Sequence, residues 1–389
     1  MSGSETGLVG SLAEVLPATA RALGVELADP APPTWRLPDA ARAVVVLIDG
    51  LGDLLLADRA SYAPFLSSLR TPSSRPPGLP GSLVAGFPST TATSIASLGT
   101  GVPPGAHGMV GYQVLDPGTG RLLNELSWED GPDPRLWQPR RTVFEQVAAA
   151  GVDVAQTGPA FFAGSGLTEA ALRGARFLPA RTLDARVDAV AAAVRASPRS
   201  LVYLYWGEVD KVGHVQGCGS YAWCDELAEV DLALRSLAAR LPSDCLLVVT
   251  ADHGMVDVPL DRRVDLAGED PLARKLAMGV RLTGGEPRAP MLYCESDQTQ
   301  AVLARWRAEL MTDFDVLSRD EAVAAGWFGP VGELASSRIG DVVCAATGGR
   351  TVHDSRVQRT ELLALVGMHG ARTDAEVRIP LLVRAPAGP

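Results

Sequence analysis

The stretch Ala43-Val44-Val45-Val46-Leu47-Ile48-Asp49-Gly50-Leu51-Gly52 decides the fold of this chain. Its residues are apolar at both odd and even positions until an Asp and a Gly end the run. A strand that is apolar on both faces is covered on both faces, which happens in a parallel sheet flanked by helices. We therefore expect residues 43–48 to form a strand of such a sheet.

Three further segments repeat this pattern, and amphipathic segments separate them. The expected strands are residues 152–157, 200–205 and 245–250, with a last core strand at 379–383; the expected helices are residues 142–150, 183–195 and 222–241. Alternating strands and helices are typical of a doubly wound α/β fold, with a mostly parallel central sheet and helices on both faces.

Two regions depart from this alternation. Between Met255 and Leu365 shorter extended pieces surround one helix at 297–310, so we interpret residues 256–365 as a smaller lobe inserted in a single domain that spans residues 1–389. Residues 8–23 carry apolar side chains at helical spacing. Pro17 is expected to split this helix in two, because a proline inside a helix breaks its hydrogen-bond ladder.

The composition excludes several classes of function. A net charge of −10 and a pI near 5.1 argue against a nucleic acid duplex as partner, since such partners require a basic face. No apolar run reaches transmembrane length, and the N-terminal residues contain no basic segment of a signal peptide. We therefore expect no membrane span and a cytoplasmic location; the sequence does not indicate the oligomeric state.

A hydroxyl-rich turn leads into a short apolar helix over Phe87-Pro88-Ser89-Thr90-Thr91-Ala92-Thr93-Ser94-Ile95-Ala96-Ser97-Leu98-Gly99-Thr100-Gly101. Pro88 ends the preceding extended segment, and Ser89 or Thr90 can cap the helix. One of these hydroxyls should therefore lie where free backbone N–H groups and the positive end of the helix dipole converge. Such a place suits an anion, although a Ser/Thr-rich N-terminus is more often only a cap.

Acidic and histidine residues follow three of the expected strands, and one more histidine lies in a late Gly-flanked turn. They are Asp49, Glu208, Asp210, His214, Asp252, His253 and His369. Each alone has an ordinary interpretation as a turn or surface residue. Because the carboxyl ends of parallel strands meet at one edge of a sheet, we expect the set to gather there. Carboxylates mixed with imidazoles suit zinc, or less selectively manganese or iron, better than magnesium or calcium.

These motifs together resemble the alkaline phosphatase superfamily and, within it, the type I phosphodiesterase/nucleotide pyrophosphatase family. The motifs lie in the family's order between residues 43 and 370. They are Asp49-Gly50-Leu51-Gly52, the turn Phe87-Pro88-Ser89-Thr90-Thr91 with its helix ending Gly99-Thr100-Gly101, Glu208-Val209-Asp210-Lys211-Val212-Gly213-His214, Ala251-Asp252-His253-Gly254-Met255 and Met368-His369-Gly370. The resemblance implies an alkaline-phosphatase-like catalytic domain.

The resemblance also implies two divalent metal ions, most consistent with zinc, and a threonine nucleophile. The first ion is implied at Asp210, His214 and His369, and the second at Asp49, Asp252 and His253 together with the oxygen of Thr91. Thr91 matches the family's nucleophile; Thr90 is the nearest rival, and Ser89 and Thr93 are more distant. Two cations about 3.5–4 Å apart can hold the attacking and leaving oxygens of a displacement at phosphorus.

The chain departs from the family at residues that contact substrate. The family's Asn that binds a phosphoryl oxygen has no match, and the helix offers the hydroxyl of Ser94 instead. The aromatic residue that follows the nucleophile is replaced by Ala92, whereas the second aromatic residue of the nucleobase sandwich matches Tyr205. Phe161 and Trp206 are expected to line a substitute apolar pocket.

We expect a two-metal phosphohydrolase that cleaves a phosphodiester or pyrophosphate bond in a small molecule through a covalent phosphothreonine. A phosphomonoesterase acting on a small or lipid-like phosphate is the close alternative, but such enzymes add Arg or Lys near the phosphate, and the metal motifs carry only Lys211. Phosphomutase relatives rank third, since they generally use Ser as nucleophile and a larger inserted lobe. A non-catalytic, metal-stabilised binding module is the alternative from a different class.

Overall fold

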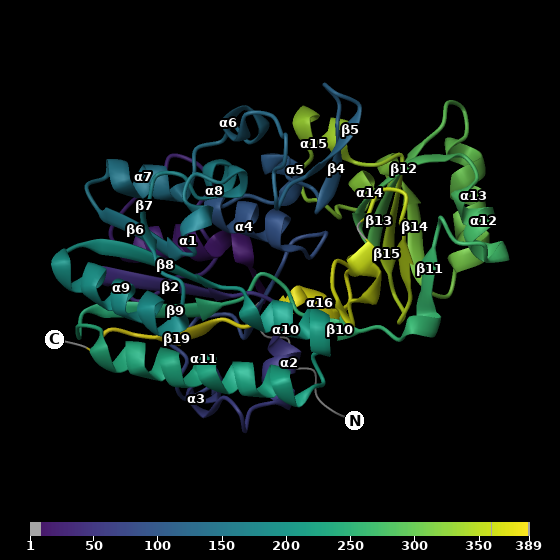
Figure 1. Ribbon diagram of the computed structural model, residues 1–389. Helices are drawn as coiled ribbons and strands as arrows, with labels where there is room; N and C mark the ends of the chain where they lie inside the picture. The colour runs from purple at the N-terminus through teal and green to yellow at the C-terminus, as the bar shows by residue number, and fades with distance from the viewer. Residues whose placement is uncertain (1–8, 359, 388–389) are drawn as a thin grey trace.

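In the described part of the chain the central sheet has six strands, in the order β19-β9-β2-β8-β6-β7 (Figure 1). The computed structural model describes residues 9–358 and 360–387. The strands are β2 (Arg42–Ile48), β6 (Asp153–Gly158), β7 (Arg176–Pro179), β8 (Ser200–Trp206), β9 (Cys245–Thr250) and β19 (Leu382–Arg384). All neighbours are parallel except β19, which pairs antiparallel with β9. Every residue of β2 after Arg42 is buried, and the predicted doubly wound, mostly parallel α/β fold is confirmed.

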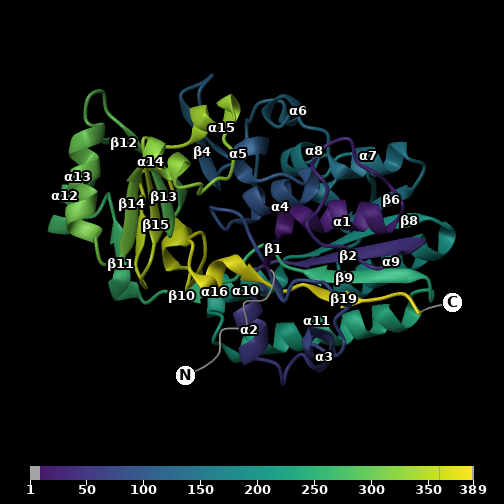
Figure 2. The same cartoon turned by 180° about the vertical axis from the view of Figure 1, so that it is seen from behind.

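Helices cover both faces of this sheet, as Figures 1 and 2 show from opposite sides. One layer contains α1 (Val15–Ala22), α4 (Thr91–Thr100), α7 (Val143–Ala149) and α8 (Gly166–Ala171), and the other contains α3 (Pro64–Arg70), α9 (Leu183–Ala196) and α11 (Tyr221–Arg240). On α11 the buried residues Leu227, Val230, Leu234 and Leu237 recur at the predicted helical spacing. Among the described residues no helix is both long enough and apolar enough to cross a membrane.

The prediction that Pro17 splits the first helix is wrong. Helix α1 begins at Val15, directly after the short helix η1 (Leu12–Glu14), and runs through Pro17 without a break. Pro17 is the third residue of α1, where a backbone N–H has no acceptor inside the helix, so proline costs little there. The predicted start at Leu8 lies outside the described residues, and residues Val9–Ser11 form strand β1.

A second, antiparallel sheet lies beyond the edge of the central sheet where α10 (Glu208–Gln216) begins (Figure 1). Its order is β12-β13-β15-β14, with β12 (Val280–Glu286), β13 (Ala289–Cys294), β14 (Phe314–Ser318) and β15 (Val342–Ala346). Helices α12 (Pro271–Ala277) and α13 (Thr299–Leu310) pack on it around the fully buried Trp306, in an apolar cluster separate from the main core. This sheet lies within the predicted lobe, whose limits at 256 and 365 stay a prediction.

Short elements connect the two sheets. The small strand pairs and triplets are β1-β3-β18 (Val9–Ser11, Ser82–Val84, Arg378–Ile379), β4-β5 (Gln113–Asp116, Arg121–Asn124), β10-β17 (Val256–Asp257, Gly367–Met368) and β11-β16 (Arg263–Asp265, Thr351–His353). The remaining helices are α2 (Asp53–Asp58), α5 (Pro104–His107), α6 (Pro134–Trp137), η2 (Ala160–Phe162), η3 (Leu260–Arg262), α14 (Arg319–Ala324), α15 (Glu333–Arg338), η4 (Thr360–Ala364) and α16 (Asp374–Val377).

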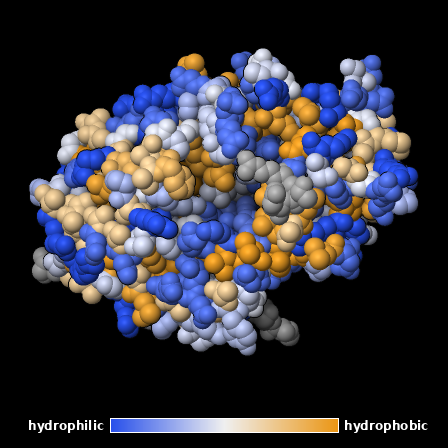
Figure 3. Space-filling view, viewed as in Figure 1, coloured by the Kyte–Doolittle hydropathy of each residue, from blue (hydrophilic) through white to orange (hydrophobic). Residues whose placement is uncertain are grey.

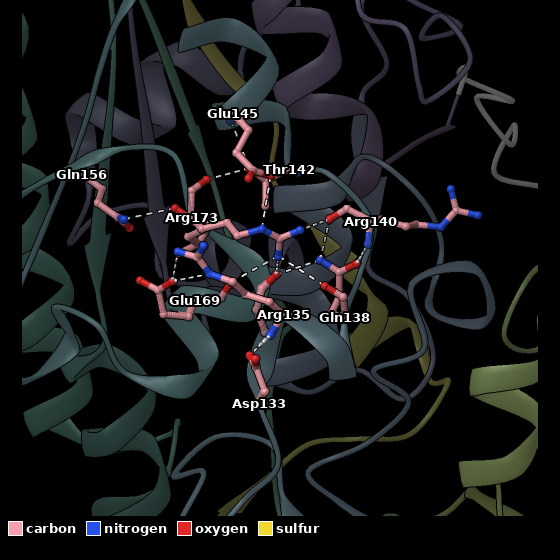
Figure 4. Close-up of polar contacts among 11 residues, drawn as sticks. Asp133, Arg135, Gln138, Arg140, Thr142, Glu145, Gln156, Glu169 and Arg173 are labelled. Carbon is pink, nitrogen blue, oxygen red and sulfur yellow. Dashed lines mark hydrogen bonds and ion pairs between the residues drawn. The ribbon is translucent and has the colours of Figure 1, made fainter. Parts of the chain in front are cut away.

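A buried arginine fixes the helices behind α4. The guanidinium of Arg173 donates to the backbone carbonyl oxygens of Gln138, Arg140, Glu169 and Ala170 (Figure 4). Its fork of N–H groups can satisfy several acceptors at once. The segments that it joins include α8, and α8 packs on α4. This network therefore supports the helix that carries Thr91.

Candidate metal and catalytic site

Three carboxylates meet at the carboxyl edge of the central sheet. Asp49 follows β2, Asp210 lies in α10 after β8, and Asp252 follows β9. Because β2 pairs with β8 on one side and β9 on the other, Asp49 lies between the other two. Gly50 has φ +73°, and a Cβ there would come within 3.0 Å of the Cα of Asp210, so only glycine permits this close approach.

Asp49 and Asp252 are buried, Asp210 is half-buried, and all three have few partners of their own. Asp49 is 3% exposed and Asp252 is fully buried, and Oδ1 of Asp49, Oδ1 of Asp210 and Oδ2 of Asp252 have no hydrogen-bond partner within the described part of the chain. Burial, together with the charges of Asp252 and Asp210, raises the pKa of Asp49 well above its usual value. Buried carboxylates without partners are costly unless a cation offsets their charge.

Three histidines present the same ring nitrogen to these carboxylates. The Nδ1 atoms of His214, His253 and His369 lie 2.7, 3.0 and 2.9 Å from the backbone carbonyl oxygens of Gly367, Gly254 and Ser89 respectively. A carbonyl oxygen only accepts, so each Nδ1 carries the proton and each Nε2 keeps its lone pair. Metal-binding histidines are commonly oriented in this way.

The first cluster contains Asp210, His214 and His369. The Nε2 atom of His214 lies 3.3 Å from Oδ2 of Asp210 and 3.3 Å from Nε2 of His369. Ligand atoms of Asp210, His369 and His253 all lie within 4.8 Å of one another. One carboxylate and two or three imidazoles form a donor set that fits zinc.

The second cluster contains Asp49, Asp252 and His253. The Nε2 atom of His253 lies 3.4 Å from Oδ1 of Asp49 and 3.6 Å from Oδ2 of Asp252, and the ligand atoms of all three lie within 4.8 Å of one another. The structure therefore brings all six predicted metal ligands together at one edge of the sheet. Their unpartnered oxygens and lone pairs fit two divalent cations.

Of the hydroxyl residues Ser89, Thr90 and Thr91 where the turn leads into α4, Thr91 faces the second cluster. It is the first residue of α4, and its Oγ1 lies 3.3 Å from Nε2 of His253 and 3.5 Å from Oδ2 of Asp49. The rival hydroxyls point elsewhere: Ser89 donates to the carbonyl oxygen of Ala371, and Thr90 donates to Glu286.

A pocket of about 240 Å³ opens above Thr91 on the side of the antiparallel sheet. Figure 3 shows the surface hollowed between the two parts of the molecule, with hydrophilic and hydrophobic residues around the hollow. The pocket is lined by Thr90, Thr91, Tyr112, Leu126, Asp210, His214, Glu286, Pro287, Gln358, Leu362, Leu365, Met368 and His369. Its wall thus combines the first cluster with apolar side chains.

Glu286 is a site residue that the sequence patterns do not reveal. It ends β12, is 8% exposed and lines the pocket beside Thr91. Its partner Thr90 lies 196 positions earlier in the chain, so no local spacing connects the two. The local sequence shows only a glutamate at the end of an extended segment, followed by a turn that carries Arg288 as a second charged residue.

Of the residues predicted to contact the substrate, Tyr205 and Phe161 lie on the side of the second cluster. The hydroxyl of Tyr205 donates to Asp49, so Tyr205 lies at the second cluster. The ring of Phe162 packs 5.8 Å from the ring of Tyr205, and the ring of Phe161 packs 4.7 Å from that of Phe162. Phe161 is 76% exposed, so it forms the outer end of an aromatic row that leads to the site.

Trp206 and Ser94 are not directed at the pocket. Successive side chains of a strand point to opposite faces, and Trp206 lies across β8 from Tyr205, where its indole N–H donates to Glu226 at 2.7 Å. Ser94 is fully buried and donates to the carbonyl oxygen of Asp252 at 2.8 Å. The geometry gives no support to a substrate contact by Trp206, and Ser94 supports the loop of the second cluster.

Buried titratable groups predict how the stability of the metal-free protein depends on pH. Burial raises the pKa of Glu286 to about 8 and that of Glu125 to about 7, and their stabilising contribution is lost as pH rises. Burial lowers the pKa of His107 to about 3 and that of His353 to about 4, so their contribution is lost only as pH falls below 6.5. Of these four groups, only the two glutamates make the stability of the protein depend on pH above 6.5.

We therefore expect the Tm of the protein in chelator to fall between pH 6.5 and 8. Differential scanning calorimetry at constant ionic strength measures this slope. A Tm that rises over the same interval would contradict the expected linkage.

A doubly wound sheet with paired Asp and His clusters beside a threonine at a helix N-terminus defines a protein of the alkaline phosphatase superfamily. More specifically, the chain belongs to the type I phosphodiesterase/nucleotide pyrophosphatase family, whose model matches residues 43–372. The resemblance inferred from the sequence motifs is confirmed. This membership supports phosphoester hydrolysis by a phosphodiesterase/pyrophosphatase-type enzyme.

Solved structures with the same fold include two of distant sequence. Murine ectonucleotide pyrophosphatase/phosphodiesterase 5, as an inactive threonine-to-alanine variant with AMP, superposes with a TM-score of 0.69 at 18% identity, covering 89% of this chain and 88% of that chain. Phosphonoacetate hydrolase from Sinorhizobium meliloti 1021, with phosphonoacetate, gives 0.69 at 21% identity and 94% of both chains.

A curated relative is a phosphopentomutase from Deinococcus radiodurans, 33% identical over 122 residues. This match covers 30% of the present chain and 28% of the length of the mutase. The similarity to the mutase is therefore limited to one segment of each chain.

Proposed function

We propose that this protein is a two-metal phosphohydrolase that cleaves a phosphodiester or pyrophosphate bond in a small molecule through a phosphothreonine at Thr91. The observation that carries the proposal is the position of Thr91 Oγ1, 3.3 Å from Nε2 of His253 and 3.5 Å from Oδ2 of Asp49, at the N-terminus of α4. Murine ectonucleotide pyrophosphatase/phosphodiesterase 5 is inactive when one of its threonines is replaced by alanine, which supports a threonine as nucleophile. The cytoplasmic location expected from the sequence stays a proposal.

Two divalent cations, of which zinc suits the ligands best, would be held by the two clusters. Asp210, His214 and His369 would hold one; Asp49, Asp252, His253 and Thr91 would hold the other. When bound, the cations lower the pKa of the Thr91 hydroxyl and offset the negative charge of the phosphoryl group.

The residues of the chain itself position the reaction. In the first step the Thr91 hydroxyl gives up its proton to solvent, its oxygen attacks phosphorus, and the bond to the leaving oxygen breaks, so that the leaving group departs with the bonding electrons and takes up a proton from solvent. In the second step the oxygen of a water molecule attacks phosphorus and loses a proton to solvent, the bond from phosphorus to the Thr91 oxygen breaks, and Thr91 regains a proton as the phosphate product leaves. Tyr205 fixes Asp49 through its hydrogen bond. The N–H groups of the first turn of α4, which have no acceptor in the described part of the chain, belong to the helix end that carries Thr91. Such donors would stabilise phosphoryl oxygens as they gain negative charge.

The pocket favours a diester over a monoester. None of the described residues that line it is Lys or Arg, and Lys211 pairs with Glu208 at 2.9 Å with its side chain 69% exposed. Monoesters carry an additional negative charge that Arg or Lys would offset. The apolar residues Leu126, Leu362 and Leu365 would contact a neutral or apolar leaving group, and the row from Tyr205 to Phe161 would contact a planar group on the other side.

The proposal is tested by comparing the hydrolysis of bis-aryl and mono-aryl phosphates by the purified protein with zinc supplied. We expect a higher kcat/KM for the diester, and loss of both activities in excess chelator. Negligible turnover of both substrates by protein that has bound zinc would instead support a non-catalytic binding module, and a preference for the monoester would support a phosphomonoesterase.

A further inference from the structure

The residue at the N-cap of α4 does not cap the helix. Thr90 has the extended backbone of an N-cap residue (φ −137°, ψ 148°), yet its side chain makes no capping hydrogen bond. A threonine in this position normally accepts from the backbone N–H two or three residues later. Instead, its hydroxyl donates to Oε1 of Glu286, which keeps the hydroxyl oxygen away from the helix.

The first turn of α4 consequently keeps free donors. The first residue of the helix whose N–H finds a backbone acceptor is Ser94, which donates to the carbonyl oxygen of Thr90 at 2.9 Å. Among the described residues, no acceptor is found for the N–H groups of Thr91, Ala92 and Thr93. The side chain of Thr91, the first of these residues, lies 3.5 Å from Oδ2 of Asp49, whose Oδ1 is buried without a described partner. The helix N-terminus therefore adjoins a cluster already prepared for a charged ligand.

The antiparallel sheet holds Glu286 in this position. Glu286 is the last residue of β12, and Gly370 allows it to approach the His369 loop, because a Cβ on Gly370 would lie 2.7 Å from Cβ of Glu286. Two residues further on, Arg288 makes a fully buried double hydrogen bond with Glu376 at 2.7 and 2.8 Å. Glu286 is thus anchored by contacts that do not involve Thr90.

We propose that Glu286 is a positioning residue that holds the Thr90 hydroxyl away from the N-terminus of α4, so that the backbone N–H groups of the first turn stay free to bind the phosphoryl oxygens. The inference rests on the proposed function in assigning the phosphoryl group to this site. It assigns the antiparallel sheet a role in the reaction, through a contact with the residue next to Thr91. A glutamate accepts through Oε1 whether or not its other oxygen is protonated, so the contact persists in both states.

The proposal predicts a specific pattern among four variants. Glu286→Met removes the acceptor at similar volume; the freed Thr90 hydroxyl then caps α4 and competes with the anion, which we expect to weaken phosphate binding about tenfold. Glu286→Gln keeps an acceptor oxygen and should restore binding to within about threefold of wild type. Thr90→Val in the Glu286→Met background removes the competing hydroxyl and should restore binding as well. Thr283→Val is the matched control, because Thr283 lies on the same strand and its buried hydroxyl has no described partner.

Isothermal titration of inorganic phosphate into the zinc-supplied proteins measures this pattern, with zinc content and Tm recorded for each variant. Steady-state kinetics with bis-aryl phosphate should show the loss in Glu286→Met chiefly in kcat, because the phosphoryl oxygens gain charge in the transition state. A double variant as weak as Glu286→Met overturns the inference, as does wild-type binding by Glu286→Met. Zinc-loaded wild type that hydrolyses neither ester refutes the proposed function instead, whatever the phosphate affinities.

Discussion

Thr91→Ala is expected to abolish hydrolysis of bis-aryl phosphate while the protein keeps its fold and most of its zinc. The variant removes the oxygen that attacks phosphorus, and no neighbouring hydroxyl can replace it, since Ser89 and Thr90 donate to Ala371 and Glu286. Loss of a nucleophile that acts together with its site costs at least about 10³-fold in kcat. The six Asp and His ligands stay in place, so metal analysis should still find zinc.

Thr93→Val is the matched control for this prediction. Thr93 lies two residues further along α4, is fully buried, and its hydroxyl has no described partner, so kcat should change less than about threefold if Thr91 is the nucleophile. Thr91→Ser, which keeps an oxygen, should retain measurable turnover and form a phosphoserine that mass spectrometry can detect after acid quenching. Residual activity of Thr91→Ala within tenfold of wild type would exclude the covalent mechanism.

The edge of the central sheet was predictable because short segments encode it. An apolar run that ends in Asp, as at Asp49, predicts a strand that is buried on both faces. The Asp marks the point at which this strand ends. Parallel pairing then places the ends of β2, β8 and β9 side by side, which brings Asp49, Asp210 and Asp252 together. The ligand set follows from local patterns combined with one rule of sheet geometry.

Contacts between distant segments were not predictable in this way. The bond between Thr90 and Glu286 joins residues 196 positions apart, and nothing near either residue indicates the other. The orientation of Trp206 required knowing which face of β8 carries Tyr205. The prediction at Pro17 was wrong because the effect of a proline depends on where its helix begins, and α1 begins at Val15, only two residues before Pro17.

A substitution at the second cluster is expected to have a second large effect: the free energy of unfolding of the metal-free protein rises while zinc binding weakens. Asp252 is fully buried, its Oδ2 has no described partner, and its charge raises the pKa of Asp49. Asp252→Asn removes this charge and should stabilise the metal-free protein by about 1–3 kcal/mol. The same change weakens the second cluster, so the rise of Tm on adding zinc should shrink and turnover should fall by at least about 10³-fold.

Asp53→Asn provides the comparison that makes this result diagnostic. Asp53 is also buried, but Arg70 donates to both of its carboxylate oxygens at 2.9 and 3.0 Å, so its charge is already offset. Neutralising it leaves the guanidinium of Arg70 without its opposite charge and should destabilise the protein with or without zinc, while the zinc-dependent rise of Tm persists. Thermal unfolding of both variants in chelator and in excess zinc separates the cases. If Asp252→Asn destabilises the metal-free protein as Asp53→Asn does, the carboxylates at the edge of the sheet are held by contacts within the protein, and their burial does not indicate a bound cation.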